Sequence, residues 1–72
     1  MKILLNDFNK LRDFLEISQK ERSRIELRHN GYIVDGKSML GIMSLDLSQP
    51  IELTLALNNL EAYEKYKKFE VK

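Results

Sequence analysis

The sequence predicts an α+β domain in which one antiparallel sheet is covered on one face by helices. Three patterns indicate this class. Apolar residues recur every three or four positions over residues 8–20, which is typical of one helical face. Apolar and polar residues alternate around an Asn-Gly pair at 30–31, which is typical of half-buried strands. The same alternation returns over residues 51–57.

The N-terminal segment predicts a short strand followed by a helix. Residues 2–5 are largely apolar and are expected to form the strand. Asn6 and Asp7 are good N-cap residues, because their side-chain oxygens accept hydrogen bonds from the free N–H groups of a first helical turn. A helix is therefore expected over residues 8–20, with an inward stripe that consists of Phe8, Leu11, Phe14, Leu15 and Ser18.

The segment 24–34 predicts a β-hairpin. Ile25 and Leu27 alternate with polar residues, so a half-buried strand is expected there. The Asn-Gly pair that follows suits a two-residue type I′ turn, in which both central residues need a positive φ. A return strand is expected over residues 32–34, ended by an Asp-Gly pair.

The second half of the chain predicts a short helix, a strand and a closing helix. Ser38 is an N-cap candidate, and the apolar run behind it fits one or two helical turns. Residues 51–57 alternate as a strand, and Asn58 or Asn59 can cap a last helix over residues 60–69. The expected inward stripe of that helix consists of Leu60, Tyr63, Tyr66 and Phe69. Two i,i+4 ion pairs are also expected on it, Glu61–Lys65 and Glu64–Lys68.

Length and charge limit the functions that the chain can carry. Its 72 residues fit one domain, 1–72, in the order β-α-β-β-α-β-α. Twelve basic and 11 acidic residues give a net charge of +1, so no strong field attracts nucleic acid or an acidic membrane. The apolar run at the N-terminus is too short for a signal peptide. A cytoplasmic protein with no direct nucleic-acid or membrane partner is therefore expected.

No enzyme, metal or cofactor site is indicated. The chain has no cysteine, and a single histidine cannot build a zinc site. His29 precedes the Asn-Gly turn and is expected to be exposed rather than catalytic. The aspartates fall on different elements, where they fit caps, turns and surface positions: Asp7, Asp13, Asp35 and Asp46. The chain is therefore not expected to be an enzyme or to need a cofactor.

A nucleic-acid surface is also disfavoured. Two glutamates, Glu21 and Glu26, interrupt the basic stretch that consists of Lys20, Arg22, Arg24 and Arg28. The outward positions of the two longer strands carry no aromatic residue on which a base could stack, since they are Glu26, Arg28, Glu52 and Thr54. A solvated charged face is the preferred interpretation.

Ser38 and the apolar residues behind it are the most informative feature. The simplest interpretation is an N-cap before a core helix. A serine at a helix N-terminus is also a favourable place to add phosphate, because free N–H groups, the helix dipole and the neighbouring Lys37 stabilise the charge. On so short a helix, some apolar surface is expected to be exposed as a docking site for a protein, formed by Met39, Leu40 and Met43.

Residues 37–45, Lys-Ser-Met-Leu-Gly-Ile-Met-Ser-Leu, resemble the regulatory-serine motif of the HPr family. HPr proteins are the histidine-containing phosphocarriers of the bacterial sugar phosphotransferase system. Their motif in low-GC Gram-positive bacteria reads Lys-Ser-Ile-Met-Gly-Val-Met-Ser-Leu, which is identical at Lys37, Ser38, Gly41, Met43, Ser44 and Leu45. The resemblance is clear over residues 25–57 and general outside them. It implies an open-faced β-sandwich, with a four-stranded antiparallel sheet and three helices on one side.

The chain departs from the family at the phosphocarrier site. The family carries its phosphoryl group on a histidine within a Gly-x-His-x-Arg-Pro pattern, between the first strand and the first helix. When residues are counted back from Ser38 without gaps, Asp7 falls near the position of the family's histidine and Asn9 near the position of its arginine. His29 lies on the hairpin and does not replace the missing histidine.

The resemblance therefore implies a non-phosphocarrier module of carbon catabolite regulation, similar to the family's paralogue that lacks the histidine and keeps the serine. Ser38 would be phosphorylated by an ATP-dependent HPr kinase, Lys37 would be its charged neighbour, and Met39, Leu40 and Met43 would dock partners. The implied partners are the kinase, a transcription regulator or a component of the phosphotransferase system. Two alternatives stay open. One is a phosphocarrier that uses Asp7, and the other is a plain interaction module in which Ser38 is only a cap.

Overall fold

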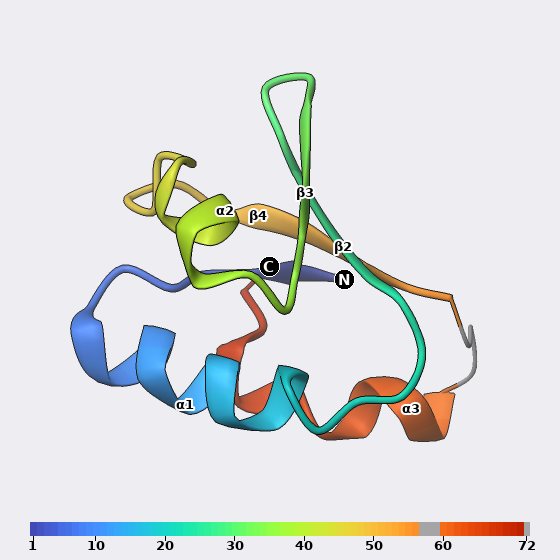
Figure 1. The fold of residues 1–72 in the computed structure, drawn as a ribbon. Helices are drawn as coiled ribbons and strands as arrows, with labels where there is room; N and C mark the ends of the chain where they lie inside the picture. Colours follow the sequence, from blue (N-terminus) through green and yellow to red (C-terminus); the bar gives the residue numbers. More distant parts are fainter. Residues whose placement is uncertain (57–59, 72) are drawn as a thin grey trace.

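In the computed structural model, which describes residues 1–56 and 60–71, strands and helices alternate in the predicted order. The elements are β1 (Lys2–Ile3), α1 (Phe8–Ser18), β2 (Ile25–His29), β3 (Tyr32–Asp35), α2 (Met39–Met43), β4 (Ile51–Leu55), α3 (Leu60–Glu64) and a 3-10 helix, η1 (Lys67–Phe69) (Figure 1). Over the described residues the fold is α+β, with a four-stranded antiparallel sheet and three α-helices, which confirms the predicted class.

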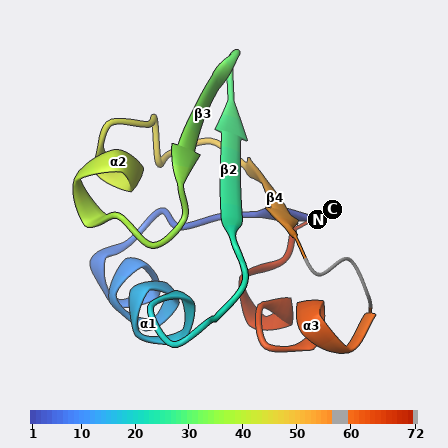
Figure 2. The same cartoon turned by 45° about the vertical axis from the view of Figure 1, so that its right-hand side comes forward.

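The sheet has the strand order β1-β4-β2-β3, and each neighbouring pair is antiparallel. Side chains alternate along each strand, so cross-strand partners such as Leu27 and Leu53 share a face. The apolar positions are buried on the face that α1 and α3 cover, and the two views agree on this arrangement (Figures 1 and 2). The opposite side, called the open face below, carries Lys2, Glu26, Arg28, Ile33, Asp35, Glu52 and Thr54.

The predicted hairpin is present with the predicted turn. Asn30 and Gly31 have φ values of 49° and 82°, as a type I′ turn requires. His29 pairs with Tyr32 next to the turn. In both views the tip of the hairpin projects clear of the rest of the chain (Figures 1 and 2).

The core is centred on three aromatic side chains between the helices and the sheet. Phe14 from α1 lies 5.5 Å from Tyr66 and 5.6 Å from Phe69, measured between ring centroids. All three are buried against the apolar face of the sheet. Such pairs add about 0.5–1.5 kcal/mol each beyond the area that they bury.

Helix α1 is shorter than predicted, and its buried face agrees with the predicted stripe except at Phe8. It ends at Ser18, with Gln19 as its C-cap, two residues before the predicted end. The buried positions are Leu11, Phe14 and Ser18. The expectation that Phe8 points inward is wrong, because it is the first residue of the helix and is 75% exposed.

The C-terminal segment differs most from the prediction. The expected helix over residues 60–69 is divided into α3 and η1, and its buried residues are Ala62, Tyr66 and Phe69. Leu60 was expected inside but opens α3 and is 87% exposed. Strand β1 stops at Ile3 and β4 at Leu55, both earlier than predicted. The predictions for Leu57, Asn58 and Asn59 lie outside the described residues.

The lysines of this segment make ion pairs that differ from those predicted. Lys65 contacts Glu21 at 2.9 Å, and Lys67 contacts Glu64 at 3.2 Å. A lysine that can reach a largely buried carboxylate on another element gains more than from an exposed neighbour on its own helix. Tertiary packing therefore accounts for the pair of Lys65 with Glu21, whereas Lys67 and Glu64 form a local i,i+3 pair.

Candidate functional site

Ser38 is the N-cap of α2, as predicted. Its backbone is extended (φ −99°, ψ 114°), and its Oγ accepts a hydrogen bond from the N–H of Gly41 at 3.1 Å. Its carbonyl oxygen accepts from Ile42 at 2.9 Å. The hydroxyl therefore satisfies one of the free donors of the first turn, and the side chain is half-buried.

A tight turn delivers Ser38 to this position. The carboxylate of Asp35 accepts a hydrogen bond from the N–H of Lys37 at 2.9 Å, and the Asp35 carbonyl accepts from the N–H of Ser38 at 3.1 Å. The carbonyl of Lys37 accepts from the Gln19 side chain at 3.5 Å, which connects the turn to the end of α1. Lys37 and Ser38 are thus fixed by strand β3 on one side and by α1 on the other.

Helix α2 has one buried and one exposed apolar face. Ile42 is fully buried, whereas Met39, Leu40 and Met43 are 52%, 80% and 57% exposed. The expected exposure of apolar surface on this helix is therefore present. These three residues are called the α2 patch below. Flexible methionines around an exposed leucine are typical of surfaces that bind other proteins.

Asp7 caps α1, as predicted. Its carboxylate accepts a hydrogen bond from the Lys10 N–H at 2.8 Å, and its backbone is extended. It borders a hollow of about 300 Å³ whose other lining residues include Phe8, Leu11 and Leu47. No arginine, lysine or histidine lines this hollow, and Asn9 beside it is exposed and uncharged. The nearest cation that the hydrogen bonds give is the Lys10 ammonium, which donates to the side chain of Asn6 at 3.4 Å.

His29 is half-buried, so the expectation of an exposed side chain is wrong. It lies two residues after Leu27 and therefore faces the helix-covered side of the sheet. Its Nε2 is buried and has no hydrogen-bond partner among the described residues. Two hydrogen bonds from Ser48 lower the pKa of Asp46, and the charge of His29 adds to this effect.

Sequence analysis missed a polar cluster around Glu21. Its carboxylate accepts hydrogen bonds from Lys65 at 2.9 Å and from the Tyr66 hydroxyl at 3.2 Å. The hydrogen bond from Lys65 is the main cause that lowers the pKa of Glu21. Burial, and then the Glu21 charge, raise the pKa of Tyr66. The cluster joins the segment after α1 to the C-terminal segment through these contacts.

Three further exposed apolar residues were not anticipated as surface features: Phe8, Tyr32 and Ile33, which are 75%, 71% and 55% exposed. Tyr32 lies on the same face of the sheet as Val34, whose side chain approaches Gly41 of α2. For Tyr32 the signal in the sequence was the Asn-Gly turn directly before it, because a side chain at the projecting tip of the hairpin loses the cover of the helices.

Comparisons with family models, with curated proteins and with solved structures find no match for this chain. Over the described residues, no helix is long and apolar enough to cross a membrane. In the same part of the chain, no three metal-ligating side chains come together.

Proposed function

We propose that this chain is an HPr-like regulatory or binding module that docks proteins through the α2 patch, is switched by phosphorylation of Ser38, and does not carry phosphoryl groups. The observation that supports this proposal is the position of Ser38 directly before an exposed apolar helix face. The four-stranded antiparallel sheet and three helices are compatible with an HPr-like fold. The regulatory-serine motif at residues 37–45 adds the resemblance to that family.

The geometry of Ser38 fits a reversible switch. A phosphate on Oγ can keep the hydrogen bond from the Gly41 N–H, because its oxygens are stronger acceptors than the hydroxyl. The free N–H groups of the first turn favour the added negative charge. Phosphorylation would therefore place about two negative charges beside the α2 patch without unfolding the helix.

The test is phosphorylation by a bifunctional HPr kinase with ATP, followed by intact mass and peptide mass spectrometry. We expect one phosphate on Ser38 and none on the Ser38→Ala variant. Ser44→Ala is the matched control, because Ser44 is exposed at the other end of the same helix and should leave phosphorylation unchanged. An unmodified chain, in a reaction where the kinase does modify an HPr protein, would contradict the switch.

The docking role of the α2 patch can be tested with the same kinase. Leu40 is 80% exposed, so Leu40→Ser should preserve the fold and weaken docking. We expect a raised KM for phosphorylation, with a kcat close to that of the unmodified sequence. An unchanged KM for Leu40→Ser and for Met43→Ser would remove the patch from the proposal.

A further inference from the structure

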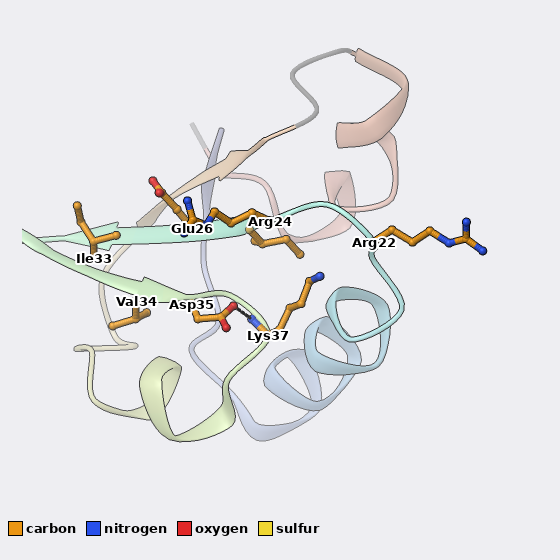
Figure 3. A pocket seen from close by; sticks show the side chains of 8 residues that line it. Arg22, Arg24, Glu26, Ile33, Val34, Asp35 and Lys37 are labelled. Atoms are coloured by element: carbon orange, nitrogen blue, oxygen red, sulfur yellow. Dashed lines mark hydrogen bonds between the residues drawn. The ribbon is translucent and has the colours of Figure 1, made fainter.

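A groove of about 510 Å³ lies at the start of β2 and the end of β3, separate from the α2 patch. Its lining includes Arg24, Glu26, Ile33, Asp35 and Lys37. Arg24 and Glu26 come from the β2 side, and Ile33 and Asp35 come from β3 (Figure 3). None of the α2 patch residues lines it.

The positive and negative side chains of this groove differ in whether they have ionic partners. Glu26 pairs with Arg28 at 3.6 Å, whereas Asp35 accepts a hydrogen bond from the backbone N–H of Lys37 at 2.9 Å and makes no ion pair with a described residue. Arg22, Arg24 and the Lys37 ammonium also form no ion pair within the described part of the chain. Three cations without an ionic partner therefore face one such carboxylate, and the balance of charge in the groove is positive.

The directions of the side chains add to this difference. Arg24 extends along β2 toward Glu26, and the Lys37 side chain reaches from the turn after β3 toward β2 (Figure 3). Arg22 points away from the groove, so it adds positive charge only at the outer rim (Figure 3). Ile33 lies at the other end, on the open face, and is 55% exposed. Two cations and one apolar contact thus share one hollow.

We propose that this groove binds a short acidic segment of a partner protein, whose carboxylates contact Arg24 and Lys37 and whose apolar side chain packs on Ile33. Charge complementarity favours this occupant, because carboxylates can pair with cations that have no partner. A nucleic acid fits less well. A base would have no surface to stack on, because no exposed aromatic side chain stands among the described open-face residues.

The probe is a synthetic peptide with four glutamates around one leucine, titrated into the protein and followed by amide chemical shifts. We expect shifts at residues 24–26 and 33–37, and weaker binding at higher salt. The double variant Arg24→Gln and Lys37→Gln should bind about tenfold more weakly, as the loss of charge-assisted hydrogen bonds implies. A peptide with glutamines in place of the glutamates should not bind.

Lys20→Gln with Lys68→Gln is the matched control, because it removes the same charge from the helix-covered side of the molecule. This control should bind the acidic peptide as tightly as the unmodified sequence does. Leu40→Ser should also keep that affinity, and this result would separate binding in the groove from the docking proposed for the α2 patch. The proposal is wrong if the control pair weakens binding as much as the groove pair, or if no groove amide shifts. Tighter binding of a uridine oligonucleotide at the same amides would also overturn it.

Discussion

Ser38 caps α2, and the phosphorylation proposed for it would use the same hydroxyl. As an N-cap it supplies an oxygen that accepts a hydrogen bond from the Gly41 N–H at 3.1 Å. The proposed phosphate would lie at the same positive end of the helix. Stability and modification therefore have to be measured separately at this residue.

The capping task predicts a stability change that involves no partner. Ser38→Ala should lower the free energy of unfolding by about 1 kcal/mol, because the Gly41 N–H loses its acceptor. Ser38→Asp should stay close to the unmodified sequence, since aspartate is an equally good cap. Urea unfolding followed by circular dichroism measures both. Equal stability of the alanine and aspartate variants would show that the hydroxyl does not stabilise α2.

At the scale of elements, the hairpin and the turn into α2 depend on two glycines for different reasons. Gly31 has a positive φ of 82°, and nothing lies within 4 Å of the position of its missing Cβ. At Gly36 the obstacle is packing, because a Cβ there would stand 2.3 Å from Cγ2 of Ile25. The Asn-Gly and Asp-Gly pairs both predict turns from sequence, but only the structure shows this difference.

These two causes predict different costs for alanine. Gly31→Ala should destabilise the chain by about 1 kcal/mol through backbone strain alone. Gly36→Ala should cost more, about 1–3 kcal/mol, because Ile25 is fully buried and the methyl group that would be displaced, Cγ2, is fixed to its branched Cβ. Thermal unfolding of the two variants under identical conditions gives the order. A Gly36→Ala variant as stable as Gly31→Ala would mean that Ile25 can move freely.

At the scale of the whole molecule, local patterns predicted the elements well and their ends poorly. The hairpin, the α2 cap and the alternation of β4 follow from turn chemistry and side-chain period, which act over a few residues. Phe8 and Leu60 were placed inside because their spacing fits a stripe, yet each is the first residue of its helix and reaches past the cover of the sheet. Burial at helix ends depends on the neighbouring elements, which a one-dimensional period does not contain.

The candidate site also contains features that local patterns predicted and features that they did not. Ser38 and the α2 patch were predicted, because a cap and an apolar run are local features. The groove between Arg24 and Lys37 was not, because it joins residues from either side of the hairpin through the register of β2 and β3. The Glu21 cluster connects residues 44 and 45 positions apart, and no local pattern signals such a contact.

The Glu21 cluster holds the segment after α1 to the C-terminal segment, and it makes the stability of the molecule depend on pH. The hydrogen bond and charge of Lys65 lower the pKa of Glu21 in the folded chain below its usual 4.5. The unfolded chain therefore binds the proton more readily, and the folded state gains stability as the pH rises through this range. The contribution is fully present above about pH 5 and is lost as the pH falls through the lowered folded pKa.

Glu21→Gln tests this linkage directly. At neutral pH the variant should be less stable than the unmodified sequence, because glutamine cannot form the ion pair with Lys65. The difference should shrink as the pH falls below 4.5, where the unfolded chain binds the proton first, and should level off below the lowered pKa of Glu21 in the folded chain. Tyr66→Phe is the control, since it removes a weaker contact with Glu21 and should keep the pH dependence. Asp46 also titrates with a lowered pKa, but it is present in every variant, so differences between urea unfolding curves cancel its effect. A stability difference that stays constant from neutral to acidic pH would show that Glu21 acts only through the shape of its side chain.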